Sequence, residues 1–316
     1  MYYLGIDLGG TNIAAGIVNE RFAIVKQGST PTLAYRDAEE IVRDMGALCC
    51  RLMEETGITA REIAYAGVAV PGSVDPKKGL LVYANNLPFQ QYPICEVLRR
   101  YCPVERVHLE NDGSAAALGE AVAGAAKGAR SSLMITLGTG VGGGIILNGK
   151  VYSGFNYAGG EVGHMVIEQG GVPCTCGRRG CWEAYSSATA LKRMTGEKMA
   201  SCSDSLMWTL CDGDPEKVSA RTAFDAAKKG DRAGAEVVDT YIKYLACGVT
   251  NMINIFQPDV LSIGGGVSNE GDALLMPLRA IVDRDQYTRD EAIKTKVCIA
   301  ELKSDAGIIG AAALGI

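Results

Sequence analysis

Three cysteines and a histidine lie close together near the middle of the sequence. Cys174, Cys176 and Cys181 fall within eight residues, and His164 precedes the first of them by ten. Thiolate sulfur and imidazole nitrogen are ligands that zinc prefers, and three cysteines with one histidine complete a tetrahedral set. Because four protein ligands leave no position for water, we expect a structural Zn²⁺ rather than a catalytic one. Such an ion would order the glycine-rich loop around it.

Three glycine-rich turns come after short apolar segments that are predicted to be strands. They are Gly9-Gly10-Thr11, Gly138-Thr139-Gly140 and Gly264-Gly265-Gly266. Backbone N–H groups exposed at such turns can bind the oxygens of a phosphate. The second turn also matches the dinucleotide-binding pattern Gly-x-Gly-x-x-Gly, but that pattern requires a helix after the turn. Here the hairpin signal Asn148-Gly149 follows a short apolar segment, so we reject a dinucleotide fold.

Two aspartates are placed where they could act on a phosphate or a hydroxyl group. Asp7 comes directly before the first glycine turn and could hold Mg²⁺, which favours one or two carboxylates together with phosphates. A solvated aspartate at the end of a strand is the alternative for Asp7. Asp112 follows the predicted strand 106–110 and begins a predicted helix. A helix N-cap is the alternative for Asp112.

The elements that would position these residues alternate between strands and helices, which indicates the α/β class. Strands are predicted at 3–8, 13–18, 64–70, 106–110, 133–137, 144–147 and 260–263. Helices are predicted at 37–57, 184–194, 222–229 and 232–254. The first strand-turn-strand pattern recurs 129 residues later, which suggests that an α/β unit was duplicated. A chain of 316 residues also exceeds what one core usually supports, so we expect two domains.

Composition excludes several classes of function. The net charge is −5, from 31 basic and 36 acidic residues, which argues against nucleic acid or an anionic membrane as a main partner. No apolar segment approaches the length of a membrane span, and no leader is apparent, so we expect a cytoplasmic protein. The eleven cysteines are an odd number and suit free thiols with one metal site. Glycine is abundant, at 40 residues, which predicts many close backbone approaches.

The residues around the cysteine cluster resemble the signature of the ROK family, the bacterial repressor, open-reading-frame and kinase group. The resemblance rests on Glu161-x-x-His164 followed by Cys174-Thr-Cys-Gly-Arg-Arg-Gly-Cys-Trp-Glu183. It extends along the chain, because further motifs occur in the family's order: Asp7 to Thr11, Val70-Pro71-Gly72, Asn86-Leu87-Pro88, Glu110-Asn111-Asp112, Gly138 to Gly144 and Gly264 to Gly266.

The resemblance implies an actin-like ATPase fold, also described as ribonuclease H-like, with duplicated α/β domains around a central cleft. Residues 1–112 would form a smaller domain that is completed by a C-terminal helix at about 304–316. Residues 113–303 would form a larger domain with the zinc loop and an adenosine turn. The implied reaction is ATP-dependent phosphorylation of a hexose hydroxyl, with glucose to glucose 6-phosphate as the first expectation. A homodimer is implied as well.

The resemblance also implies a role for each motif residue. Asp112 would be the catalytic base. The sugar would be bound by Gly72, Asn86, Asn111, Asp112, Glu161, His164 and Glu183. ATP, with Mg²⁺ near Asp7, would be bound by Asp7, Gly9, Gly10, Thr11, Gly138, Thr139, Gly140, Gly264, Gly265 and Gly266. The structural zinc would be bound by His164, Cys174, Cys176 and Cys181.

Other functions stay open at this point. N-acetylmannosamine, allose or fructose could replace glucose as the acceptor. Family repressors carry a helix-turn-helix domain before the first glycine hairpin, whereas here the first strand starts near Tyr2, so we expect an enzyme rather than a DNA-binding regulator. A sugar-binding regulator without that domain is a further alternative. An actin-like chaperone or filament ATPase is disfavoured by Glu161, Glu183 and the cysteine cluster.

Overall fold

The structure is a computed structural model that describes residues 1–316. The chain divides into two compact units, each of which is described by itself. The first unit consists of Met1–Met134, Gly144–Gly160 and Glu301–Ile316, and the second of Ile135–Gly143 and Glu161–Ala300. The predicted boundary between a smaller and a larger α/β domain at residue 112 stays a prediction.

The first unit is built on a five-stranded sheet in the order β3-β2-β1-β4-β8. Its strands are β1 (Tyr2–Leu8), β2 (Asn12–Asn19), β3 (Ile24–Pro31), β4 (Ile63–Val70) and β8 (Val107–Asn111). Strand β1 pairs antiparallel with β2 and parallel with β4, which in turn is parallel to β8. Because side chains alternate along a strand, Leu4, Ile6 and Leu8 enter one apolar core while Gly5 and Asp7 lie on the opposite face.

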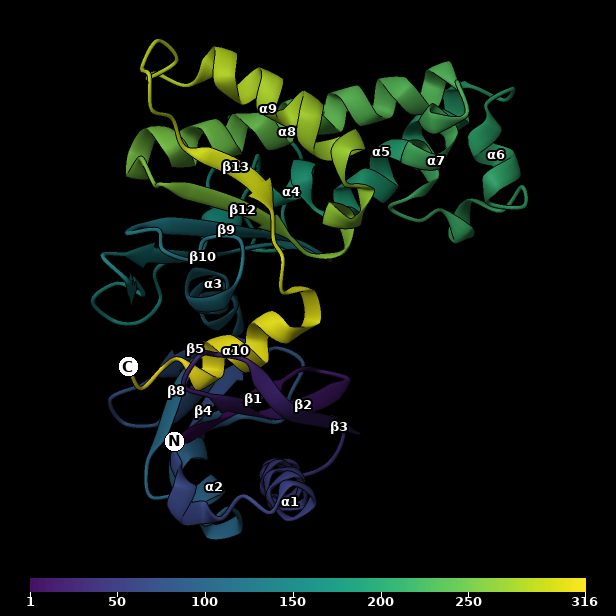
Figure 1. Cartoon of the computed structure of the whole chain (residues 1–316). Coiled ribbons are helices and arrows are strands. Elements are labelled where there is room, and N and C mark those ends of the chain that lie inside the picture. Colours follow the sequence, from purple (N-terminus) through teal and green to yellow (C-terminus); the bar gives the residue numbers. More distant parts are fainter. The chain divides into compact units, whose positions relative to one another are not determined.

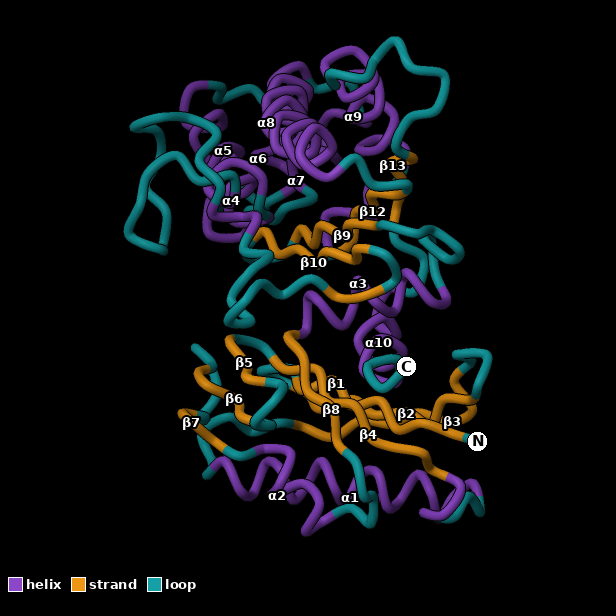
Figure 2. The backbone as a smooth tube through the Cα atoms, turned by 90° about the vertical axis from the view of Figure 1, so that its left-hand side faces the viewer, coloured by secondary structure: helices purple, strands orange, loops and turns teal.

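Helices cover both faces of this sheet, as Figures 1 and 2 show. Helices α1 (Ala38–Thr56) and α2 (Ile94–Tyr101) pack on the face that carries Leu4 and Ile6. Helix α1 confirms the prediction for 37–57, and it ends at Gly57 in the left-handed conformation. Helices α3 (Asp112–Ala123) and α10 (Ala306–Ala312) pack on the other face. Short 3₁₀ turns lie at η1 (Ala60–Glu62) and η5 (Lys303–Asp305).

Helix α10 packs unusually close to its neighbours because glycines remove side chains from the contact. A Cβ at Gly5 of β1 would lie 1.9 Å from the carbonyl oxygen of Ile308, and one at Gly67 of β4 would lie 1.8 Å from that of Ala311. On α10 itself, a Cβ at Gly310 would lie 1.7 Å from the carbonyl oxygen of Ala115. No side chain fits at these distances, so glycine is required at each position.

A second five-stranded sheet has the order β11-β10-β9-β12-β13. Its strands are β9 (Ser132–Leu137), β10 (Val141–Leu147), β11 (Lys150–Val151), β12 (Val260–Gly264) and β13 (Lys296–Ile299). Counted within each sheet, both orders are third, second, first, fourth and fifth, which confirms the predicted duplication. Strands β10 and β11 pair antiparallel across Asn148 and Gly149, both at positive φ, so the hairpin is confirmed and the dinucleotide fold is excluded.

The second unit is mainly helical beyond its strands. Its helices are α4 (Glu183–Ser186), α5 (Ala188–Ser201), α6 (Leu206–Leu210), α7 (Thr222–Lys228), α8 (Arg232–Phe256) and α9 (Asp272–Asp285), with 3₁₀ turns η2 (Val162–His164), η3 (Pro215–Lys217) and η4 (Gly266–Glu270). The prediction of one helix at 184–194 was wrong, because the helical conformation is interrupted at Ser187. This residue is the N-cap of α5, and its Oγ accepts the N–H of Ala190. None of the helices, including the 25-residue α8, is both long enough and apolar enough to cross a bilayer.

A third, small sheet belongs to the first unit. It has the order β5-β6-β7, with β5 (Ser73–Asp75), β6 (Leu80–Tyr83) and β7 (Gln90–Tyr92). The predicted sugar ligands Gly72 and Asn86 lie in the segments directly before β5 and between β6 and β7. The small sheet therefore positions two of the predicted site residues.

Candidate active site

The first glycine turn joins β1 to β2 and is held by a buried threonine. The N–H of Gly9 donates to the carbonyl oxygen of Asn12 at 2.9 Å and closes the turn. Thr32 is fully buried; its Oγ1 donates to the carbonyl oxygen of Gly9 at 2.7 Å, and its N–H donates to that of Thr11 at 2.8 Å. A Cβ at Gly10 would meet no atom within 4 Å. Thr32 thus fixes the conformation of the turn, while the backbone at Gly10 stays accessible to a ligand.

Asp7 lies on the face of β1 that packs against α10. A Cβ at Gly307 would lie 2.2 Å from Oδ2 of Asp7, so this helix can approach the carboxyl group only with glycine there. Burial raises the pKa of Asp7 from its ordinary 3.8 to about 6, and the charge of Asp112 adds to the rise. Two carboxyl groups that repel each other suit a divalent cation, and Mg²⁺ favours one or two carboxylates. Asp7 therefore fits the predicted role in magnesium binding.

Asp112 is the first residue of α3 and comes directly after the carboxyl end of β8. The N-cap of α3 is Asn111, whose Oδ1 accepts the N–H of Gly113 at 2.9 Å and that of Ser114 at 3.2 Å. The alternative that Asp112 caps this helix is therefore wrong. The carboxyl end of a parallel strand is where α/β proteins usually bind ligands, and that is the position of Asp112.

Asn111 also connects Asp112 to Gly72. Its Nδ2 donates to the carbonyl oxygen of Gly72 at 3.1 Å, which leaves a second N–H on that nitrogen for another acceptor. Gly72 has a φ of 96°, and a Cβ there would lie 2.1 Å from the carbonyl oxygen of Tyr83. The structure thus brings Gly72, Asn111 and Asp112 together in the first unit. Asn86 is exposed in the loop after β6.

The second glycine turn joins β9 to β10 and is tied to the start of α5. The N–H of Gly138 donates to the carbonyl oxygen of Gly140 at 3.0 Å. The N–H of Ala188 donates to the carbonyl oxygen of Gly138, and Oγ1 of Thr189 donates to that of Thr139, each at 2.8 Å. A Cβ at Gly138 would meet no atom within 4 Å. Like Gly10 in the first turn, Gly138 leaves the backbone of its turn accessible.

The third glycine turn ends β12 and leads into η4. Gly265 has a φ of 81°, and a Cβ there would lie 2.5 Å from the carbonyl oxygen of Leu137. Oγ of Ser268 donates to the carbonyl oxygen of Gly265 at 2.7 Å. At Gly266 a Cβ would again meet no atom within 4 Å. Each of the three turns thus has one glycine at which an added Cβ would meet no atom within 4 Å.

The four predicted zinc ligands meet at one point of the second unit. Their ligand atoms all lie within 4.8 Å of one another. Sγ of Cys174 is 3.6 Å from Nδ1 of His164, and Sγ of Cys176 is 3.7 Å from Sγ of Cys181. Zinc bonds of about 2.3 Å to sulfur and about 2.0 Å to nitrogen give tetrahedral edges of about 3.8 and 3.5 Å, which these two separations match.

The thiols of this cluster differ in their readiness to ionise. The N–H of Arg178 is the main cause that lowers the pKa of Cys176. Burial, with the thiol of Cys176 next, raises the pKa of Cys181 to about 12. A metal that binds Cys181 must therefore displace a proton, which makes binding tighter at higher pH.

A buried tryptophan anchors the zinc loop beside Glu183. Trp182 follows Cys181 directly and is fully buried; its Nε1 donates to the carbonyl oxygen of Tyr244 on α8 at 3.1 Å. A Cβ at Gly248 of α8 would lie 2.0 Å from the indole ring, so α8 accepts the ring only at a glycine. Three consecutive residues are therefore the predicted metal ligand Cys181, the core anchor Trp182 and the predicted sugar ligand Glu183.

Glu161 and His164 are related by a short helical turn, as predicted. Glu161 precedes η2, and the N–H of His164 donates to its carbonyl oxygen at 3.1 Å. Nδ1 of His164 faces Cys174, so Nε2 is left for another partner. A Cβ at Gly163 would lie 2.1 Å from the carbonyl oxygen of Val141, which packs this turn against the start of β10. The second unit thus brings together Glu161, His164, Glu183 and the second glycine turn.

Sequence reasoning missed several residues that support the site. Thr32 holds the first turn, Thr189 holds the second, and Gly307 faces Asp7. Tyr185 was missed too; its hydroxyl accepts the N–H of Val172 at 2.6 Å and supports the zinc loop. No motif marks these residues, because each acts on a segment far away in the sequence. Only Gly307 among them carries a signal, which is the high glycine content of the chain.

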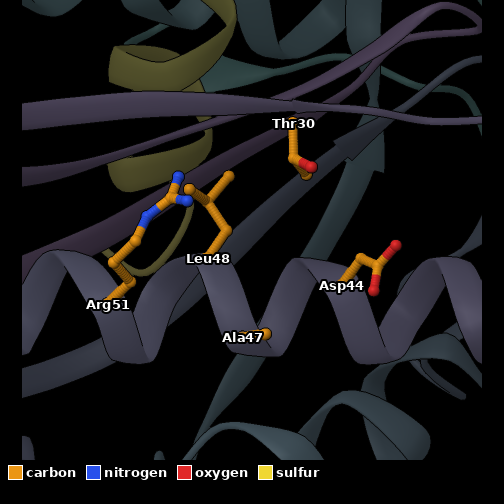
Figure 3. A pocket seen from close by; sticks show the side chains of 5 residues that line it. All are labelled: Thr30, Asp44, Ala47, Leu48 and Arg51. Carbon is orange, nitrogen blue, oxygen red and sulfur yellow. The ribbon is translucent and has the colours of Figure 1, made fainter.

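A surface hollow of about 230 Å³ lies elsewhere, between β3 and α1 (Figure 3). It is lined by Thr30, Asp44, Ala47, Leu48 and Arg51. Asp44 is already paired with Arg36 at 2.8 Å. None of the predicted site residues lines this hollow, so it does not belong to the candidate active site.

The sequence profile of the ROK family matches residues 3–316. The chain belongs to the ROK family. Its fold is accordingly the actin-like ATPase fold, which agrees with the two sheets of the same strand order. The expectation that rested on the cysteine motif is thereby confirmed.

Several ROK family relatives are similar over nearly their whole length. A glucokinase from Thermotoga maritima is 37% identical over 314 residues, covering 98% of this chain and 96% of that protein. The structure of a ROK family glucokinase from Streptomyces griseus in complex with glucose and AMPPNP is 31% identical, with a TM-score of 0.80 and 99% of both chains covered. A ROK hexokinase from Thermus thermophilus has the same identity and TM-score, with 99% and 97% covered.

Proposed function

We propose that this protein is an ATP-dependent sugar kinase that converts glucose to glucose 6-phosphate. The observation that carries the proposal is the placement of Asp112 at the carboxyl end of β8, next to Asn111, which is hydrogen-bonded to Gly72. Asp112 is also close enough to Asp7 for its charge to raise the pKa of Asp7. The similarity to glucokinases over nearly the whole chain supports glucose as the acceptor.

Phosphoryl transfer passes through a loose transition state, so catalysis depends on positioning, charge neutralisation and one acceptor for the hydroxyl proton. Asp112 would accept that proton. The backbone at the first and second glycine turns would bind the phosphates of ATP, and Gly264 to Gly266 would bind the adenosine. Mg²⁺ held near Asp7 would neutralise phosphate charge.

The sugar would be bound by the residues that the family motifs mark, which are Gly72, Asn86, Asn111, Glu161, His164 and Glu183. Carboxylates accept hydrogen bonds from sugar hydroxyls, whereas Nε2 of His164 would donate one. With Nδ1 on zinc, the proton of the imidazole must reside on Nε2, so the metal would fix the tautomer that the sugar needs.

Zinc would have a structural role at this site. His164, Cys174, Cys176 and Cys181 form a closed set of four protein ligands, so the ion would fix the loop that carries Glu183 rather than activate a water. We propose a homodimer on the basis of the family alone, to be checked by analytical ultracentrifugation of the purified protein.

An ADP-release assay tests the proposed function. ATP and Mg²⁺ are supplied with glucose, N-acetylmannosamine, N-acetylglucosamine, allose and fructose in turn, and kcat/KM is compared. We expect glucose to give the highest value. A higher value for another sugar would reassign the acceptor, and turnover of none would favour a sugar-binding regulator, which isothermal calorimetry with the same sugars would reveal.

A further inference from the structure

The two carboxylate oxygens of Glu183 have different surroundings. Oε2 accepts the N–H of Val141 at 2.9 Å, and Val141 is the first residue after the second glycine turn. Oε1 faces the zinc loop, 3.4 Å from Oγ1 of Thr175 and 3.9 Å from Sγ of Cys174. One oxygen is therefore bonded to the turn, while the other lies among side chains of the loop.

The carboxylate also fills space beside the turn. A Cβ at Gly140 would lie 2.2 Å from Oε2 of Glu183 and 3.1 Å from its Cδ. At the carbonyl side of the same residue, Gly163 packs against the carbonyl oxygen of Val141. The N–H of Val141 is thus hydrogen-bonded to Glu183, and its C=O packs against the turn that carries Glu161 and His164.

We propose that Glu183 is a positioning residue for the second phosphate turn, in addition to its role as a sugar ligand in the proposed function on which this inference rests. Oε2 fixes the N–H of Val141 and so sets the path of Gly138 to Gly140. Oε1, oriented by Thr175, is the atom offered to a sugar hydroxyl. One carboxylate then links the nucleotide turn to the sugar ligands within the second unit.

The two roles make opposite predictions for nucleotide binding without sugar. A carboxylate beside the turn repels the phosphates of ATP, so loss of its charge alone would tighten nucleotide binding. If the carboxylate also holds the turn, its replacement lets Val141 move and weakens nucleotide binding. A ligand of the sugar alone would leave sugar-free nucleotide affinity unchanged or slightly increased.

The experiment measures the Kd of Mg²⁺-AMPPNP by calorimetry in the absence of sugar. For Glu183→Gln we expect affinity to fall about fivefold, since a charge-assisted hydrogen bond to the N–H of Val141 becomes a weaker neutral one. The control is Asn86→Ala, a proposed sugar ligand on the first unit, which should weaken glucose binding and keep the Kd of AMPPNP. Unchanged or tighter AMPPNP binding by Glu183→Gln would overturn the inference.

A second variant changes the same contact at the glycine turn and leaves the cysteine cluster unaltered. Gly140→Ala should displace the carboxylate and weaken AMPPNP binding to a similar extent, with an unchanged zinc content. The double variant with Glu183→Gln should then bind AMPPNP about as weakly as the weaker single variant, because both substitutions act on the same contact. Fully additive losses would contradict the shared contact. If the wild type binds AMPPNP but no sugar, the proposed function fails while this test of Glu183 still stands.

Discussion

Asp7 and Asp112 lie close enough in the first unit for their charges to interact. Burial, together with a smaller contribution from the charge of Asp112, raises the pKa of Asp7 to about 6. The two residues come from the ends of β1 and β8, on either side of β4. A metal-free protein at neutral pH therefore carries an electrostatic penalty at the place where we propose that the cation binds.

The first prediction concerns pH. The folded pKa of Asp7 exceeds its ordinary 3.8, so the stabilisation from neutral Asp7 is complete below about pH 4 and is lost as pH rises through about 6. Without Mg²⁺, the stability of Asp7→Asn relative to the wild type should therefore rise between about pH 4 and pH 6, by on the order of 2 kcal/mol, and stay constant at higher pH. Urea unfolding at several pH values measures this difference, and a difference that does not vary with pH would contradict it.

The second prediction concerns catalysis. Asp112→Asn keeps the shape of the side chain but cannot accept the hydroxyl proton, so kcat should fall by roughly 10² to 10⁴-fold. Glucose affinity, measured by calorimetry, should change much less. Turnover close to that of the wild type would remove Asp112 from the role of base.

The third prediction concerns zinc. Elemental analysis of protein purified without chelators should find about one zinc per chain, because the four donors match a tetrahedral site. Cys181→Ser should lower the zinc content and weaken glucose binding, since Glu183 follows two residues later. Cys211→Ser, at a buried cysteine outside the cluster, is the matched control and should keep the zinc. Metal-free wild-type protein with full glucose affinity would argue against the proposed structural role.

The fourth prediction concerns the packing of α10. Gly310→Ala would place a methyl group 1.7 Å from the carbonyl oxygen of Ala115, so thermal unfolding should occur at a clearly lower temperature. Gly196→Ala in α5 is the matched control, because its Cβ would meet no atom within 4 Å. That variant should be more stable by up to about 1 kcal/mol, as alanine favours a helix. Equal melting temperatures for the two variants would contradict the close contact.

Features encoded locally could be predicted from the sequence. Asn148-Gly149 specifies its own hairpin, and the apolar spacing from Ile41 to Leu52 specifies α1. The cluster of His164 with three cysteines could be predicted because metal binding by thiols restricts both residue type and spacing, and its zinc stays a prediction. The sites for sugar and nucleotide came from the family motifs, and their assignment stays a prediction.

Features that depend on distant segments could not be predicted. Asp112 and Asn111 are both good N-caps by type, and only the backbone path shows that Asn111 makes the hydrogen bonds. The bond from Val141 to Glu183 joins residues 42 apart, and no periodicity marks it. Thr32 and Gly307 likewise act across the fold, so their roles appear only when the sheet and α10 are in place.

The place of α10 also bears on how the chain can fold as it is synthesised. Every residue of the second unit precedes Glu301, whereas the first unit needs α10 to cover Gly5 and Gly67. Domains usually fold in the order in which they leave the ribosome. Here the first unit cannot finish folding until α10 has been synthesised, and until then the backbone at Gly5 and Gly67 stays uncovered. The second unit can already be complete by that time.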